Sequence, residues 1–279
     1  MDIRAATDAD VPAIRAILAA HGNDGPIVIG DIVGPYVRHL IGRGGARVAV
    51  VDDEVVAFAA TVDTGRSTHL ADFFVHPDRL GQGIGRPLLD AVFGDSRVRT
   101  TFSSDDPRAL PLYVRAGMDP IWPSLYIQGL GSALPKVGPA FTTATADPDR
   151  LAAIEREWTG AGREADHAYW ASMAGSDPFV VLDGDAIVGI GYARVRQATP
   201  IRVVDRLLIH RDAEPVATAC AAMARAGGAG PVFACFLGVH PAVRPLLEAG
   251  FRVADRDQFM TSDPEIVDPV RLLPNPGML

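Results

Sequence analysis

The sequence predicts an α/β fold with a mixed sheet, arranged as two tandem domains that each have a central, mostly antiparallel twisted sheet flanked by helices. The same order of strand-like and helix-like segments runs through the 279-residue chain twice. His76 and His210 occupy equivalent places 134 residues apart, and Gly117 and Gly250 do so 133 residues apart. An offset held over that distance indicates a duplicated domain.

The boundary between the copies is expected in a stretch that contains both glycine and proline. We expect domains at residues 1–130 and 140–279, joined by a linker at 131–139. Two domains of about 130 residues each are long enough to bury separate cores, and 48% of the chain is apolar.

The segments of the first copy follow from periodicity, caps and turns. Thr7 or Asp8 is expected to cap a first helix whose apolar residues share one face, and Asp106 with Pro107 should begin a later helix that stops at Gly117. The expected strands are 3–7, 46–51, 55–61, 71–76, 98–103 and 121–127, and the expected helices are the one after Thr7, 33–41, one from the glycine-rich loop to residue 93, and 107–115.

The second copy repeats this order. Asp147 is expected to cap a helix that runs through Trp158, in the place of the first helix of the leading copy. The expected strands are 141–145, 179–182, 187–195, 203–210 and 232–237, with helices through residues 216–223 and ending at 246–251.

Composition narrows the class of protein. The formal charge of −8 and the pI near 5.3 argue against nucleic-acid binding, which needs clustered Lys and Arg. Cys220 and Cys235 lie in apolar runs and are expected to be buried small hydrophobes, too few for a disulfide framework or a structural zinc site. With no signal-like start and no apolar run of membrane length, we expect a cytoplasmic monomer or homodimer that uses no metal and no membrane.

The most informative segment is 72–89, which reads DFFVHPDRLGQGIGRPLL. Three alternating glycines allow backbone N–H groups to converge ahead of a helix N-terminus, which is a place that binds phosphate. A P-loop is excluded because Arg86 and Pro87 follow the last glycine where Lys and Ser or Thr are required. The spacing G-x-G-x-G also differs from the dinucleotide fingerprint G-x-G-x-x-G.

This segment resembles motif A of the GNAT acyltransferase superfamily, Arg/Gln-x-x-Gly-x-Gly/Ala, with Leu80 in the place of the usual Arg or Gln. The resemblance implies that the loop holds the pyrophosphate of acetyl-CoA through backbone amides, and that the preceding strand pairs with the pantetheine arm. The residues expected to bind acetyl-CoA are Phe73, Phe74, Val75, Gly81, Gln82, Gly83, Ile84, Gly85, Arg86 and Asp106.

A catalytic tyrosine is implied by a second resemblance. The string DDPRALPLYVRAG resembles motif B of the same superfamily, whose tyrosine hydroxyl protonates the CoA thiolate, and it places Tyr113 in that role. A phenol with an ordinary pKa near 10 can donate a proton to a thiolate. Alignment of the terminal glycines puts Leu246 at this position in the second copy.

The general base must take a proton from the acceptor amine. Asp72, at the start of the motif A strand, is the leading candidate, and His69 and Asp63 are alternatives. His76 precedes a proline and is expected to form the turn, because His210 stands at the same place in the other copy.

Acceptor recognition is expected from the loop after the first helix and from the closing strand. The residues expected to contact the acceptor are Asp24, Asp31, Trp122 and Tyr126. The segment 162–170 is interpreted as a capped helix that buries Trp170, with the lining of a cleft between the copies as the alternative.

The second copy departs from the first at the phosphate loop. It reads RDAEPVA after His210, without a glycine, and Asp212 and Glu214 place negative charge where a diphosphate would need amides. We therefore expect this copy to have lost acyl-CoA binding. The resemblance implies an N-acetyltransferase that moves the acetyl group of acetyl-CoA to a primary amine of a small molecule by direct attack in a ternary complex. A non-catalytic acyl-CoA-binding or sensing protein, and acetylation of a protein amine, remain alternatives.

Overall fold

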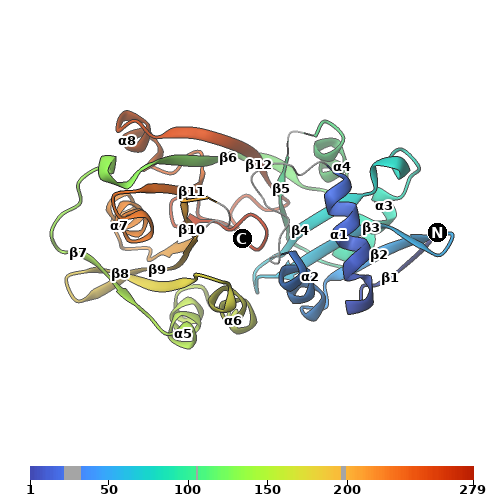
Figure 1. Ribbon diagram of the computed structural model, residues 1–279, viewed down its shortest axis with the longest axis horizontal. Coiled ribbons are helices and arrows are strands. Elements are labelled where there is room, and N and C mark those ends of the chain that lie inside the picture. The colour runs from blue at the N-terminus through green and yellow to red at the C-terminus, as the bar shows by residue number, and fades with distance from the viewer. Residues whose placement is uncertain (22–32, 105, 196–198) are drawn as a thin grey trace.

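The computed structural model describes residues 1–21, 33–104, 106–195 and 199–279. Each half is a sheet flanked by helices, as the sequence predicts, and the two halves lie side by side (Figure 1). The first half contains β1 (Asp2–Ala5), α1 (Val11–Ala20), α2 (Val33–Gly42), β2 (Ala46–Val51), β3 (Glu54–Asp63), β4 (Thr68–Val75), α3 (Gly85–Phe93), β5 (Arg99–Ser103), α4 (Ala109–Arg115) and β6 (Asp119–Leu130). The second contains β7 (Phe141–Thr145), α5 (Pro148–Thr159), α6 (Glu164–Ser172), β8 (Asp177–Asp183), β9 (Ala186–Val195), β10 (Arg202–Ile209), α7 (Pro215–Gly227), β11 (Pro231–Leu237), α8 (Val243–Glu248), β12 (Arg252–Thr261) and β13 (Leu272–Leu273).

The closing strands of the two halves are exchanged. Within the described residues the sheet runs β1-β2-β3-β4-β5-β12-β6-β11-β10-β9-β8-β7. β12 pairs with β5 of the first half, whereas β6 pairs with β11 of the second, and β6 and β12 run side by side between them (Figure 1). Each sheet is therefore completed by a strand of the other half. The closing strand expected at residues 121–127 forms within β6, but it pairs with β11 and β12 rather than with β5 of its own half.

The duplication is visible in backbone detail. The β3–β4 hairpin and the β9–β10 hairpin carry a bulge at the same place. The register shifts between Leu70 and Asp72 on β4 and between Val204 and Arg206 on β10. Arg206 therefore stands at the position of Asp72. His76 and His210 each accept a hydrogen bond from the backbone N–H two residues ahead, both at 3.3 Å, which confirms their expected role in the turn.

Helices end and begin largely where their residues predict. The Asp147 carboxylate accepts from the Asp149 N–H at 2.9 Å and caps α5, as expected. Thr7 precedes a short 3-10 turn that leads into α1. Gly117 and Gly250 end α4 and α8 with φ of 84° and 89°, a backbone conformation that favours glycine. Trp170 is fully buried on α6, which confirms that this segment is a helix that buries Trp170. No side chain of the described residues caps this helix at Arg163, so the expected cap is wrong.

The segment after β12 lies between the two halves (Figure 1). Pro276 accepts a hydrogen bond from the His69 ring at 2.9 Å, and Gly277 accepts one from the Tyr36 hydroxyl at 3.2 Å. The carbonyl of Leu279 accepts from Arg163 and Arg206. This segment therefore ties the first half to the second.

Candidate active site

The first half contains a cleft where β4 and β5 separate. These parallel strands are paired only between Thr68–Leu70 and Arg99–Thr101. Beyond Leu70, β4 is paired with β3 alone. The strands therefore part at the middle of the sheet and leave one side of β4 open.

Backbone groups of β4 border this opening. The N–H of His76 donates to the Val56 carbonyl at 2.8 Å, so residue 76 faces β3. In an antiparallel ladder such pairing alternates, and the backbone groups of Phe73 and Val75 therefore face the opposite side. The His21 Nε2 lies 2.7 Å from the Val75 carbonyl oxygen on that side.

The cleft has a volume of about 660 Å³, within the range of small-molecule sites. It unites both candidate catalytic residues with nearly all of the expected acetyl-CoA residues. The predicted residues that line it are Asp72, Phe73, Phe74, Val75, Gly81, Gly83, Ile84, Gly85, Arg86, Asp106 and Tyr113. Gln82 is absent from this lining and donates from Nε2 to the Asp78 carbonyl at 3.2 Å.

The glycine loop leaves room for an anion at the start of α3. Gly81 and Gly83 have φ of 76° and 78°, and open space surrounds the position of a Cβ at either residue. A Cβ at Gly85 would lie 3.2 Å from the Phe73 ring. No side chain among the described residues caps the α3 N-terminus, where Ile84 is the N-cap. The residues therefore fit a diphosphate held by main-chain amides.

Asp72 has the properties of a base that works near neutral pH. Burial raises the pKa of its carboxyl from 3.8 to about 7, and the hydrogen bond with the Tyr36 hydroxyl moderates that rise. Tyr36 comes from α2 and also contacts the carbonyl of Gly277. A carboxylate with this pKa is partly ionised at pH 7 and can accept a proton from an ammonium group.

Tyr113 is buried on α4 and faces the same cleft. Burial raises the pKa of its hydroxyl, and the negative charges of Asp72 and Asp106 raise it further. The phenol therefore stays protonated and can serve as a proton donor. Its ring packs edge-on against Phe73 with 6.3 Å between centroids.

The alternative bases are placed elsewhere. His69 is fully buried, with Nδ1 3.0 Å from the Thr100 hydroxyl, and burial lowers the pKa of its ring to about 4. The Asp63 carboxylate accepts from the Gly65 N–H at 2.8 Å within the β3–β4 turn. Neither residue lines the cleft, so the geometry favours Asp72.

Asp106 is occupied by its neighbour. Its carboxylate accepts from the Arg108 backbone N–H at 2.9 Å and from the Arg108 guanidinium at 2.7 Å, and the latter bond lowers the pKa of the carboxyl. α4 begins at Ala109, two residues later than Pro107 predicts. Asp106 thus forms the turn before the helix while it borders the cleft.

Of the four expected acceptor residues, the structure describes only Trp122 and Tyr126, and neither of these lines the cleft. Asp24 and Asp31 lie outside the described residues. Trp122 stacks on Phe259 at 5.9 Å, away from the cleft lining. The Tyr126 hydroxyl donates to Asp257, which does line the cleft.

Several residues at this site were not predicted from the sequence, and three of them lie beside the candidate catalytic groups or come from another part of the fold. His21, Tyr36 and Asp257 come from the end of α1, from α2 and from the exchanged strand β12. His21 and Tyr36 flank the loop already expected to receive the acceptor, which was a usable signal. Asp257 reaches the cleft only through the strand exchange.

The corresponding opening in the second half is filled by the chain itself. β10 and β11 also pair at only three residues, Arg202–Val204 with Val232–Ala234. Beyond them β13 pairs with β10, with Leu207 opposite Leu273 and Leu208 opposite Leu272.

Two further differences separate this opening from the cleft of the first half. The Glu214 carboxylate accepts from the backbone N–H groups of Val216 and Ala217 at the α7 N-terminus. Leu246, at the position of Tyr113, is fully buried. The chain's own groups therefore occupy the open edge of β10 and the N-terminus of α7.

The described part of the chain contains neither a membrane-spanning helix nor a cluster of metal-binding side chains. None of its helices has the length and apolar character needed to cross a membrane. Within the same residues, no group of three His, Cys, Asp or Glu side chains is arranged to hold a metal ion. Both cysteines are free and buried, as expected.

Comparison with known proteins agrees with this architecture. Residues 43–117, which include β4, the glycine loop and Tyr113, match the family model of the acetyltransferase (GNAT) domain. The match therefore falls on the part of the first half that forms the cleft. Mycothiol acetyltransferase of Parafrankia sp. (strain EAN1pec) is 33% identical over 132 residues, which span 42% of this chain and 38% of that protein.

Solved structures share the whole tandem fold. A Pyrococcus horikoshii protein superposes with a TM-score of 0.73 at 15% identity, over 100% of this chain and 94% of the other. A tandem GNAT protein from the clavulanic acid biosynthesis pathway has a TM-score of 0.62 at 17% identity, over 95% of this chain and all of that one. At these identities the likeness concerns the fold alone.

Proposed function

We propose that this protein is an acetyl-CoA-dependent N-acetyltransferase whose acceptor is a primary amine of a small molecule. The observation that carries the proposal is the single cleft that unites the glycine loop, Asp72 and Tyr113. A thioester bound there would supply an electrophilic carbonyl, with its diphosphate at the α3 N-terminus and its pantetheine arm along residues 73–75.

The chain's own groups account for each proton. Asp72 takes a proton from the acceptor ammonium, and the freed amine nitrogen attacks the carbonyl carbon. A backbone N–H of the open β4 edge stabilises the developing oxyanion. The C–S bond then breaks, and Tyr113 gives its proton to the thiolate sulfur. The N–C bond replaces the C–S bond. The nitrogen then loses its second proton through water to the Tyr113 phenolate, which restores the phenol, and Asp72 releases its proton to solvent.

We further propose that residues 1–130 form the catalytic domain, that 131–139 link it to the rest, and that residues 140–279 no longer bind acyl-CoA. Three observations support this: β13 fills the β10 opening, Glu214 caps α7, and Arg206 replaces the base. The exchanged β12 gives the second half a supporting role in the first sheet.

The test is a thiol-release assay with acetyl-CoA and a panel of amines, amino sugars, peptides and the acceptor of mycothiol acetyltransferase. Turnover on a small amine that is lost in Asp72→Asn supports the proposal. Turnover on peptides alone favours a protein amine as acceptor. Tight acetyl-CoA binding without turnover on any acceptor favours a sensing role.

A further inference from the structure

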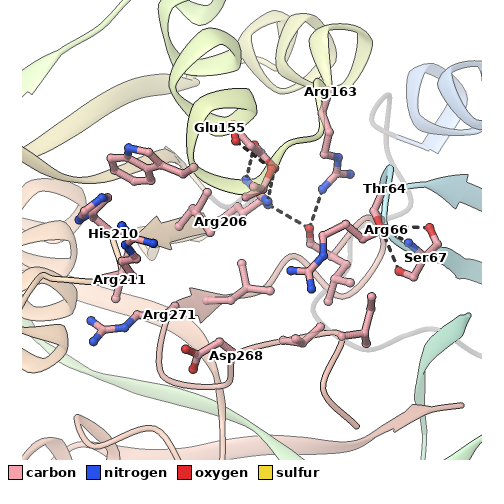
Figure 2. Close-up of a pocket in the computed structure, with 18 of the residues that line it drawn as sticks. Thr64, Arg66, Ser67, Glu155, Arg163, Arg206, His210, Arg211, Asp268 and Arg271 are labelled. Atoms are coloured by element: carbon pink, nitrogen blue, oxygen red, sulfur yellow. Dashed lines mark hydrogen bonds and ion pairs between the residues drawn. The ribbon is translucent and has the colours of Figure 1, made fainter. Parts of the chain in front are cut away.

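A cavity of about 500 Å³ lies between the two halves, and none of the described residues that line it also lines the acetyl-CoA cleft. Three parts of the chain meet there: the β3–β4 turn, helix α5 with the end of β10, and the segment 266–272 (Figure 2). Its volume is that of a site for a small molecule.

The floor of the cavity contains buried arginine side chains that are paired with buried carboxylates. The Arg206 guanidinium donates to both Glu155 oxygens at 2.9 and 2.8 Å. The Arg163 Nε donates to Asp166 at 2.9 Å. All four side chains are at most 6% exposed. The guanidinium groups of Arg163 and Arg206 are therefore held in place, and few of their N–H donors remain to bind a ligand.

Arg66 is differently placed, because it is exposed and forms no hydrogen bond or ion pair with any described residue. The turn that carries it is rigid. The N–H and the hydroxyl of Thr64 both donate to the Ser67 carbonyl, at 2.9 and 3.0 Å. A Cβ at Gly65 would collide with Ala161 of the second half. Figure 2 shows Arg66 extending from this turn into the cavity.

Two more guanidinium groups, of Arg211 and Arg271, lie on the opposite wall (Figure 2). The Nη1 of Arg271 donates to the Ala213 carbonyl at 2.6 Å, which fixes the side chain and leaves its other two nitrogens for a ligand. The nearby Asp268 accepts from the Val270 N–H at 3.0 Å and is thereby committed to its own turn.

The lining also has an apolar part, formed by Trp158, Leu208, Ile266 and Leu272, and one exposed carboxylate, that of Glu157. The His210 ring stands edge-on to Trp158 at 5.0 Å. The lining contains five arginines against the three carboxylates of Glu155, Glu157 and Asp268, and such an excess of positive charge is unexpected in a chain of formal charge −8. Low-dielectric walls concentrate the field of such charges on whatever enters.

We propose that this cavity binds a small polyanion, a molecule with two or more carboxylate or phosphate groups, held between Arg66 of the first half and Arg211 and Arg271 of the second. Guanidinium forks match the geometry of carboxylate and phosphate oxygens, and charge-assisted bonds of this type are stronger than neutral ones.

The experiment is calorimetric titration of the full chain with citrate and, separately, with inorganic pyrophosphate. The variants are Arg66→Gln and Arg271→Gln, and Arg150→Gln is the matched control, because Arg150 is exposed on α5 outside the cavity. We expect saturable binding of at least one anion, weakened about tenfold or more in each cavity variant and unchanged in the control. The preferred anion distinguishes a carboxylate ligand from a phosphate ligand.

Three results would overturn the proposal. The first is the absence of heat with both anions at millimolar concentration. The second is binding that survives both cavity variants. The third is binding that is lost in Gly83→Asp instead, since the anion would then sit at the glycine loop. Thermal unfolding of each variant, with a midpoint equal to that of the wild type, shows that the loss is not one of folding.

Discussion

Replacing Asp72 by Asn should remove activity and stabilise the fold, more strongly at pH 8 than at pH 5. The pKa of Asp72 is 3.8 in its ordinary state and about 7 in the folded chain. Because the folded value is the higher one, ionisation of Asp72 disfavours folding, and the free energy of unfolding falls as pH rises from about 4 to about 7. A neutral Asn does not carry this penalty.

The magnitude follows from the size of the shift. A difference of about three units corresponds to about 4 kcal/mol at pH 8 and about 2 kcal/mol at pH 5. Asp72 keeps a partly accessible surface in the cleft, so we halve these figures for solvent screening and expect a gain of about 2 kcal/mol at pH 8 and about 1 kcal/mol at pH 5.

Urea unfolding at both pH values measures the gain, and thiol release measures an expected loss of about 10² to 10⁴ in kcat/KM. Asp63→Asn, on the turn outside the cleft, is the control and should keep its activity. A variant that is destabilised equally at pH 5 and pH 8, or one that keeps wild-type kcat/KM, would refute the assignment of the base.

Three further outcomes are expected. Tyr113→Phe should lower kcat by about 10- to 100-fold with acetyl-CoA affinity retained, because only the proton donor is lost; equal losses in calorimetric affinity and in kcat would point to a packing role. Gly83→Asp should abolish acetyl-CoA binding, whereas Gly94→Asp, at a positive φ of 50° in open space, should not; similar affinities of the two variants would show that the loop is misassigned. Tyr36→Phe should move the acidic limb of the kcat/KM profile to higher pH, because it removes the hydrogen bond that lowers the base's pKa; an unmoved limb would count against that contact.

Local chemistry was readable from the sequence. The alternating glycines, the His-Pro turn and the caps act over a few residues, so their structures follow from residue type and spacing. The repeat offset also identified Leu246 as the counterpart of Tyr113, and the matched bulges extend that equivalence to Arg206 and Asp72. Agreement of this kind is expected where each local preference supports the same fold.

Long-range pairing was not readable. β6 and β12 have similar strand patterns, and no local signal says which half either one joins. The contact between Tyr36 and Gly277 links residues 241 positions apart, and the filling of the β10 opening by β13 depends on the path of the final segment. These features depend on how segments meet in three dimensions, which residue spacing along the chain does not encode.

A crystal structure with acetyl-CoA tests the central claim most directly. We expect one molecule per chain, with its diphosphate against Gly81, Gly83 and Gly85, and with its thioester between Asp72 and Tyr113. Density for the cosubstrate beside β10, or at the cavity between the halves with the β4 opening empty, would contradict the account.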